Sequence, residues 1–244
     1  KRERSDYFYI DQRIAEYRSA RTRLDLLAGI NFDLLGQLRA GWRFGKVSKS
    51  LETGVDIFSD VAKQSSIGWL VSLDLDRLDR LVFARRGWGL QASWYDSSQR
   101  DYSKVSLEGR AAMPLQDWVV AGRASWVGSP RGQLPLNDAA KLGGFLNLTA
   151  FASGQLIGDE VTYAHVRAER IIGRPPAGLR GDMRLGIAFE TGKVAQPYTV
   201  QRSNGWVKSV AVYLGGETPL GPVYVGLGQG SGKLTNVYLF IGTP

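Results

Sequence analysis

The chain has 244 residues, no Cys, one His, 30 Gly and a formal net charge of +8. A hydrophobic content of 43% and an aromatic content of 11% exclude a disordered chain. The lack of Cys excludes a disulfide framework and a thiolate metal site. No apolar run of about 18 residues occurs, which excludes a transmembrane helix. A transmembrane β-barrel stays open, because each of its strands needs only about 9–11 residues with one apolar face.

Alternation of apolar and polar side chains recurs along the chain, with turn residues between the alternating segments. In 180–190 the apolar residues take the odd positions and the charged residues the even ones, from Arg180 to Glu190. A helix would scatter those charges around its axis. The same pattern predicts twelve strands, at 6–17, 22–33, 36–46, 66–76, 86–97, 103–113, 117–127, 160–172, 180–191, 206–216, 222–229 and 234–242.

The even strand count and the lengths of the connections favour an all-β, antiparallel transmembrane β-barrel. Every second connection between strands is short, as periplasmic turns are. The remaining connections include the three longest segments between strands, 47–65, 128–159 and 192–205. We therefore expect one outer-membrane barrel domain over 1–244, with a long extracellular loop at 128–159.

The polar face of the strands decides between a membrane barrel and its alternative, a soluble β-barrel or sandwich that binds a small ligand. In the soluble alternative the apolar face points inward, and the polar face is solvated. Here the polar face is rich in Arg and carboxylates, which suits a polar lumen joined by ion pairs. The predicted lumen network comprises Arg23, Arg39, Arg43, Glu108, Arg110, Arg123, His165, Arg167, Glu169, Asp182 and Arg184.

Aromatic residues near the strand ends support the membrane barrel, because interfacial girdles are built from such residues. The predicted girdle residues are Trp42, Phe44, Trp69, Trp88, Trp94, Trp118, Trp126, Trp206 and Tyr213.

Three stretches resemble the outer-membrane assembly and secretion barrels of the BamA, TamA and FhaC superfamily, the surface antigen barrel. The segment 75–94 is similar to a periplasmic hairpin of that family, and the match is carried by Asp79, Phe83, Arg86 and Gly87. The segment 142–151 resembles the start of the long sixth extracellular loop, and 223–244 resembles the closing strand pair. By strand count, the chain resembles either a short twelve-stranded relative or a fragment of a longer barrel.

The loop departs from the family pattern at its tip. The family usually has Val-Arg-Gly-Phe/Tyr there, with the Arg directed at acidic residues in the lumen. This loop begins with Gly143 and Gly144, and its aligned tip reads Leu148, Thr149, Ala150 and Phe151. The weakened tip looks most like the C-terminal barrels of patatin-like phospholipases of type V secretion.

The chemistry expected of this chain is limited. No Gly-x-Ser-x-Gly elbow occurs, so we expect no enzyme activity from this chain. His165 is expected to be a hydrogen-bonded lumen residue, and neither a cofactor nor a metal is expected. The glycine run 226–232 before Lys233 fails the spacing of a phosphate loop and suggests a hairpin tip of small residues beside a lumenal loop.

The net positive charge of the chain is compatible with only some classes of binding partner. Acids alternate with bases on the same strand faces, which excludes a nucleic-acid surface. Expected partners are outer-membrane lipid, lipopolysaccharide phosphates, an attached or separate periplasmic domain, and a second copy across an imperfect seam. The loop cations expected to meet lipopolysaccharide are Lys46, Lys49, Lys63, Arg100, Lys104, Arg131, Lys141, Lys193 and Arg202.

The resemblance implies a membrane anchor or a pore for protein translocation or insertion, with a weak seam between the first and last strands and a loop that plugs the lumen. The alternative is the transmembrane part of a patatin-like phospholipase whose catalytic domain lies outside this chain. A soluble ligand-binding β-barrel is the third reading.

Overall fold

The computed structural model describes residues 2–56, 63–80, 82–173, 182–201, 205–218, 221–232 and 234–242. Every regular element in these ranges is a β-strand. No helix there is long and apolar enough to cross a membrane. The strands are β1 (Arg2–Tyr9), β2 (Gln12–Asn31), β3 (Gly36–Gly54), β4 (Lys63–Asp76), β5 (Gly87–Ser97), β6 (Ser103–Leu115), β7 (Trp118–Gly128), β8 (Ala140–Leu142), β9 (Leu156–Gly173), β10 (Met183–Pro197), β11 (Val207–Thr218), β12 (Gly221–Gly230) and β13 (Thr235–Ile241).

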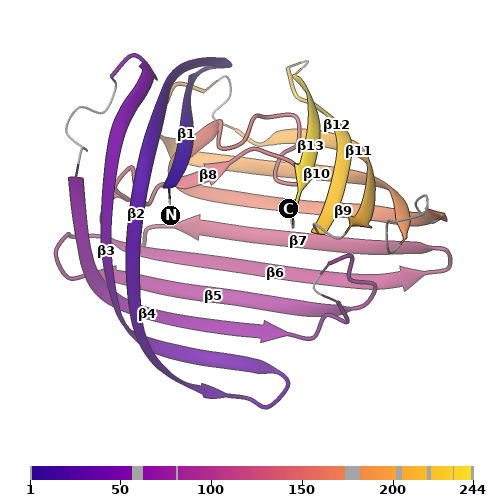
Figure 1. Cartoon of the computed structure of the whole chain (residues 1–244), viewed down its shortest axis with the longest axis horizontal. Helices are drawn as coiled ribbons and strands as arrows, with labels where there is room; N and C mark the ends of the chain where they lie inside the picture. The colour runs from indigo at the N-terminus through magenta and orange to yellow at the C-terminus, as the bar shows by residue number, and fades with distance from the viewer. Residues whose placement is uncertain are drawn as a thin grey trace.

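The strands form one curved sheet whose neighbours are all antiparallel (Figure 1). Its order follows the chain from β1 to β7 and from β9 to β13, while the short β8 pairs with β9 beside this path. Consecutive pairing is the arrangement of an up-and-down barrel, in which each strand is joined to the next by a hairpin. The prediction of an all-β antiparallel barrel is confirmed.

The prediction for the first two strands, 6–17 and 22–33, is wrong. The chain turns at Ile10, whose φ of 58° lies in the left-handed region, and β1 pairs back on β2 with Tyr9 opposite Gln12. The expected connection at 17–22 does not exist, because β2 runs unbroken through it for 20 residues. β2 stays paired with β3 through 18–22, so the polar residues at 18–22 are strand residues.

Other predicted boundaries shift outward, because strand pairing continues past the apolar segments. β3 extends to Gly54 and β10 to Pro197, beyond the predicted ends at 46 and 191. The loop between β7 and β9 is correspondingly 129–155, and it contains the unpredicted strand β8. Residues 180 and 181, the predicted start of one strand, lie outside the described residues.

The apolar face of the strands points outward and the polar face points inward. Val237 is 76% exposed, Leu239 73% and Phe189 60%, whereas the charged residues Arg184 and Glu169 are 1% and 2% exposed. An apolar outer surface is suited to lipid and unsuited to water. This polarity is the reverse of that expected for a soluble ligand-binding barrel.

Most of the predicted girdle residues lie on the outer surface, and the rings of Trp42 and Trp69 pack with centroids 4.0 Å apart. Tyr213 is an exception. Its ring is buried in the lumen, and its hydroxyl donates to Glu169 Oε1 at 2.7 Å. The prediction placed Tyr213 by its distance from the strand end, whereas the inward parity of β11 determines its position.

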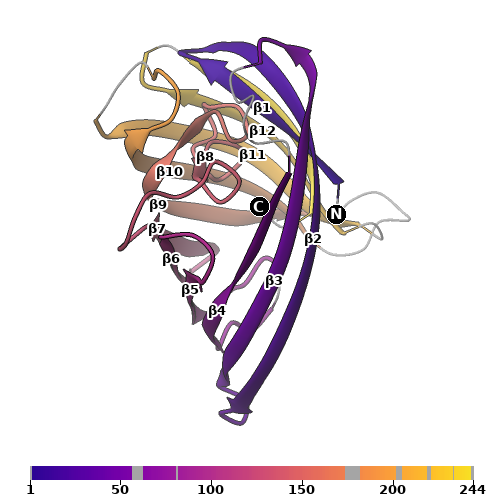
Figure 2. The same ribbon diagram turned by 90° about the vertical axis from the view of Figure 1, so that its left-hand side faces the viewer.

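β1 and β13 are the two ends of the strand path, and no ladder joins them among the described residues. Figure 2 shows β1 near the same upper end of the molecule as β12, while β2 and β3 run side by side down to the hairpin at the lower end. The two edges are therefore held by contacts other than strand pairing.

Candidate functional site: the lumenal plug

The loop between β7 and β9 folds back into the lumen rather than away from the sheet (Figure 1). We call residues 143–155 of this loop the plug. Leu146, Leu148, Thr149 and Ala150 of the plug are almost completely buried. An extracellular loop exposed to water would not bury four residues within one short turn in this way, so the plug is a packed part of the barrel interior.

Glu190 on β10 holds the tip of the plug. Its Oε2 accepts a hydrogen bond from the backbone N–H of Thr149 at 2.6 Å, and its Oε1 accepts one from the N–H of Leu148 at 3.3 Å. The Tyr163 hydroxyl also lies 3.0 Å from Oε1. Successive N–H groups that converge on one anion form a backbone nest, so the buried carboxylate is satisfied without a cationic side chain.

The nest depends on left-handed backbone at the plug tip. Leu146 has a φ of 50° and Leu148 a φ of 73°, a region that non-glycine residues seldom adopt. The Thr149 hydroxyl accepts the N–H of Leu146 at 3.0 Å and closes this turn. Such strain persists where surrounding contacts over-determine it, and the carboxylate of Glu190 is one of those contacts.

The glycines of β12 allow the plug to approach the barrel wall closely. A Cβ added at Gly228 would lie 2.6 Å from the carbonyl carbon of Thr149, and one at Gly230 would lie 2.5 Å from Ala150 Cβ. A Cβ at Gly226 would lie 2.9 Å from Phe145. The glycine run is therefore mostly the wall of the lumen against which the plug packs, and only its end reaches the hairpin tip.

β11 and β13 add polar contacts to the plug backbone. Ser209 Oγ accepts the N–H of Ala150 at 3.0 Å, and Asn236 Nδ2 donates to the Ala150 carbonyl at 2.7 Å. The Tyr238 hydroxyl donates to the Phe151 carbonyl at 2.5 Å. The last strand is thereby tied to the plug along its inner face.

The turn between β4 and β5 enters the lumen from the opposite end and meets the plug. Phe83, in left-handed backbone with a φ of 50°, packs on Tyr224 with ring centroids 5.3 Å apart. Phe145 of the plug lies 5.2 Å from the same Tyr224 ring and 5.4 Å from Tyr213. These rings form one buried cluster, so the lumen is filled from both ends.

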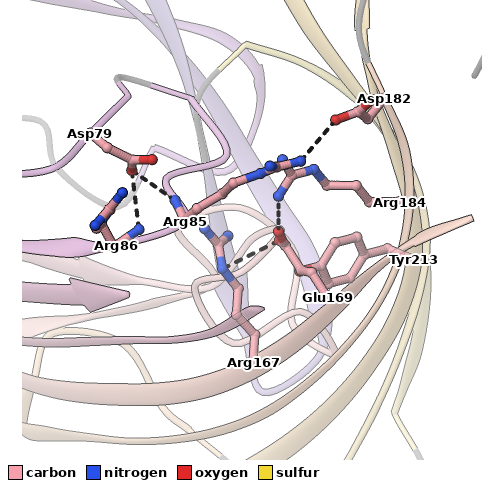
Figure 3. Close-up of polar contacts among 8 residues, drawn as sticks. All are labelled: Asp79, Arg85, Arg86, Arg167, Glu169, Asp182, Arg184 and Tyr213. Atoms are coloured by element: carbon pink, nitrogen blue, oxygen red, sulfur yellow. Dashed lines mark hydrogen bonds and ion pairs between the residues drawn. The ribbon is translucent and has the colours of Figure 1, made fainter. Parts of the chain in front are cut away.

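The predicted turn residues hold this β4–β5 turn together. Asp79 accepts the backbone N–H groups of Arg85 at 2.8 Å and Arg86 at 3.1 Å (Figure 3). Arg85 reaches across the lumen to Asp182 at 3.2 Å. Gly87 follows with a φ of 110°, and a Cβ there would collide with the carbonyl of Arg77.

A buried ion cluster lies beside the aromatic rings. Glu169 on β9 lies 3.3 Å from Arg184 and 3.4 Å from Arg167, and it also accepts the Tyr213 hydroxyl (Figure 3). The guanidinium of Arg184 lies 4.7 Å from the centroid of the Phe83 ring, which is within cation–π range. Two cations and one carboxylate thus lie together where the two lumen segments meet, and Arg184 and Glu169 are almost completely buried there.

The other predicted lumen residues mostly form ion pairs between neighbouring strands. The pairs between strands are Arg39 with Asp74 at 3.1 Å, Arg43 with Asp25 at 2.8 Å and Arg123 with Glu108 at 2.7 Å. Arg110 lies 3.5 Å from Glu108 on its own strand. Arg23 differs, because it forms no ion pair or hydrogen bond among the described residues.

His165 also faces the lumen, where its Nδ1 lies 2.9 Å from the Tyr163 hydroxyl. That hydroxyl is also 2.7 Å from the Leu146 carbonyl. His165 therefore stands behind the residues that anchor the plug. Over the described ranges, no cluster of three or more His, Cys, Asp or Glu side chains has the arrangement of a metal site.

The plug region also contacts the first hairpin. Gln155 Nε2 donates to Asp11 Oδ1 at 3.2 Å, and Lys141 Nζ donates to Ser5 Oγ at 3.2 Å. Phe151 lines an apolar cavity of about 170 Å³ between Ile10 and Leu234, which belong to the turns of the first and last hairpins. Because β13 is bound to the same plug, the plug joins the two edges that strand pairing leaves apart.

Comparison of this fold with solved structures identifies its type. BamA from Haemophilus ducreyi lacking POTRA domains 1–3 matches with a TM-score of 0.70 at 12% identity, over 93% of this chain and 53% of that chain. The chain shares its β-barrel fold with this BamA structure. CdiB from Acinetobacter baumannii matches with a TM-score of 0.58 at 14% identity, over 88% of this chain and 39% of that chain. The chain therefore spans about half or less of the length of these barrel proteins.

Sequence comparison gives no corresponding match. No protein-family model matches this chain. No curated protein matches it either. At 12–14% identity the shared property of this chain and the two solved barrels is the fold.

Sequence reasoning placed the loop tip at Leu148 to Phe151 but missed its anchor. Glu190 stands on the polar face of its strand like other charged residues, and no local pattern marks it as the partner of a loop 41 residues away. The glycines at 226, 228 and 230 were the available signal, since alternate glycines on one strand face indicate a close approach of backbone.

Proposed function

We propose that this chain is an outer-membrane barrel that passes or inserts polypeptide, with the plug as the element that closes its lumen and holds its seam at rest. The observation that supports this proposal is the double attachment of the plug. Asn236 and Tyr238 bind it on β13, and Asp11 binds Gln155 from the first hairpin. Movement of the plug would open the lumen and release both edges together.

The lipid-facing surface and the fold support a location in the outer membrane. The outward residues Phe189, Val237 and Leu239 are more than half exposed, as a barrel surrounded by lipid requires. The barrel would contact outer-membrane lipid, and lipopolysaccharide phosphates would meet the cations that remain at the long-loop end. We further propose that this chain supplies no catalytic group.

Two partners follow from the same proposal. A periplasmic domain, attached or separate, would lie at the end that carries the short turns. A second copy of the chain would cover the unpaired edges, because exposed backbone groups in lipid are costly. Native mass spectrometry from mild detergent tests the second copy, and a purely monomeric mass contradicts it.

A disulfide staple tests the plug directly, because the native chain has no Cys. Ala150 Cβ lies 2.5 Å from the position of a Cβ at Gly230, so Ala150→Cys with Gly230→Cys needs a shift of about 1 Å to form a disulfide. The assay measures how fast the barrel in lipid vesicles promotes insertion of an unfolded outer-membrane protein. We expect the oxidised variant to be inactive and dithiothreitol to restore it.

The two single-cysteine variants are the controls for the added side chains, and the activity of each should be the same before and after dithiothreitol is added. Equal activity of the oxidised and reduced double variant would contradict a mobile plug. No activity of the wild-type chain above that of empty vesicles would contradict the insertion function itself, and would leave an anchoring role for the barrel.

A further inference from the structure

The lumen wall opposite the plug encloses a second, polar cavity of about 200 Å³. Four cationic side chains from three strands line it, Arg21 and Arg23 on β2, Arg43 on β3 and Lys104 on β6. Among the described residues, Asp138 is the one acidic side chain in this lining. The cavity thus has a marked excess of positive charge.

Two of these cations are neutralised nearby. Arg43 donates two hydrogen bonds to Asp25, both of 2.8 Å. Arg21 lies 3.7 Å from the carboxylate of Asp138, which also accepts the Tyr102 hydroxyl at 2.7 Å. Neither Arg21 nor Arg43 explains the excess charge.

The other two cations form no close ion pair in the described part of the chain, although the carboxylate of Asp138 attracts both at longer range. Lys104 Nζ donates to the backbone carbonyl of Asp138 at 2.7 Å, which is a hydrogen bond to a neutral acceptor. Arg23 forms neither an ion pair nor a hydrogen bond among the described residues. Lys104 was expected to meet lipopolysaccharide outside the barrel, and that expectation is wrong, because its side chain lines the lumen. Arg202 of the same set lies outside the described residues.

Small residues line part of the remaining cavity wall, beside Val47, Leu70 and Tyr95. Arg23 pairs with Gly45 across the β2–β3 ladder, and Gly45 pairs with Ser66 across the next one. Ser93 and Ser106 lie in the same lining. A short row of glycine and serine leaves space in front of the arginine and offers hydroxyl donors, whereas a bulky apolar row would fill the space.

We propose that this cavity binds a small oxyanion with at least two negative charges, of the phosphate or diphosphate class. The fork of an arginine, the ammonium of a lysine and serine hydroxyls together form a suitable donor set for such an anion. Confined cations in a cleft with low-dielectric walls also raise the local concentration of anions.

The position of the cavity indicates that the anion comes from the aqueous lumen. On β2 the odd-numbered Arg21 and Arg23 line the cavity, while Leu24 and Leu26 at even positions are exposed on the outer face. A lipid headgroup at the outer surface would have to cross the sheet to reach these cations. The ligand is therefore a soluble anion.

Calorimetric titration of the folded barrel in detergent with pyrophosphate tests the site. We expect Arg23→Gln and Lys104→Gln each to weaken pyrophosphate binding by about tenfold or more, because each removes a charged hydrogen-bond donor. The matched control is Arg18→Gln on the same strand. Arg18 is half exposed on the opposite face and is paired with Glu52, so the control should bind pyrophosphate as the wild type does.

Three outcomes would overturn the proposal. The first is no pyrophosphate binding by the wild-type barrel, and the second is equal weakening by Arg18→Gln, which would indicate diffuse attraction to a basic protein. The third is measured in nanodiscs that contain lipid A. If Arg23→Gln retains less lipid A than the wild type, the site binds a lipid headgroup. A heat-modifiability gel establishes that each variant is folded, and Arg23→Lys, which keeps the charge, should retain binding within about threefold.

Discussion

The Oε2 atom of Glu190 lies 2.6 Å from the amide nitrogen of Thr149, so a buried carboxylate on the barrel wall is paired with the main chain of the plug. The family resemblance placed an arginine at this tip, directed at acidic lumen residues. Here the acidic residue is present and the arginine is not. The carboxylate instead accepts hydrogen bonds from the backbone nest at Leu148 and Thr149.

Loss of the charge at position 190 should loosen the plug. We expect Glu190→Gln to lower the free energy of unfolding by about 1.5–3 kcal/mol, the usual contribution of a hydrogen bond to a charged group. Urea titration in vesicles measures this change, and limited proteolysis within 143–155 reports plug release. Glu160→Gln is the control, because Glu160 accepts the Trp126 indole N–H at 3.0 Å and forms no hydrogen bond or ion pair with the plug in the described part of the chain. Equal effects of the two variants would contradict the assignment of Glu190 as the anchor.

A side chain on the inner face of β12 should displace the plug. Gly228→Val places a Cβ 2.6 Å from the Thr149 carbonyl carbon, and overpacking of this kind costs about 1–3 kcal/mol. The neighbouring Leu227 is exposed on the outer face, so Leu227→Val should leave plug proteolysis unchanged. If Gly228→Val is cut no faster than the wild type, the plug does not pack on β12 in the membrane.

Substitutions in the buried ion cluster should have strongly non-additive effects on the free energy of unfolding. Glu169→Leu leaves Arg184 and Arg167 without their shared carboxylate, and breaking a buried pair by removing one partner costs about 3–5 kcal/mol. Adding Arg184→Met should recover part of this loss, since one of the uncompensated charges is removed. A double-mutant cycle on unfolding free energy measures the coupling, and strictly additive effects would contradict it.

The β4–β5 turn should weaken in acid. Partial burial raises the pKa of the Asp79 carboxyl, but the N–H groups of Arg86 and Arg85 outweigh it and hold the pKa below its ordinary 3.8. A group with a lower pKa in the folded state contributes stability above its unfolded pKa and loses it as the pH falls through the folded one. We therefore expect Asp79→Asn to lower Tm between about pH 5 and 7 and to match the wild type near about pH 2. A constant Tm difference across this range would contradict the role of the carboxylate.

A charged side chain on the outward face should destabilise the barrel in lipid. Phe189 is 60% exposed on the outer side of β10, so Phe189→Arg should cost about 2–4 kcal/mol if this position lies near the bilayer midplane. The cost is measured by refolding the variant into lipid vesicles and comparing boiled with unboiled samples on a gel. Full stability of this variant without detergent or lipid would mean that the outer surface faces water.

The sequence was sufficient to predict the strands and the polarity of their faces. Strict alternation in β10 and β11 places Arg184 and Glu190 inward and Leu185 and Phe189 outward, and the structure has this arrangement. It was insufficient at the first hairpin, because the turn at Ile10 has neither Gly nor Pro and depends on a left-handed non-glycine residue.

The site was less predictable than the fold, because its contacts join segments far apart in the chain. Arg–carboxylate pairs such as Arg43 with Asp25 lie on adjacent strands and follow from register. The contact of Phe83 with Tyr224 crosses the lumen, and no periodicity encodes it. Arg23 departs from the expected lumen of Arg–carboxylate pairs, since it forms no ion pair among the described residues.

The nest around Glu190 also bears on how this tip can vary. A side chain that makes an ion pair must be kept, but an amide N–H is supplied by every residue except proline. Residues 148 and 149 can therefore change while the hydrogen bonds to the carboxylate remain, provided that the left-handed turn is preserved. A contact of this kind leaves no motif in the amino-acid sequence, although it holds the tip of the plug against β10.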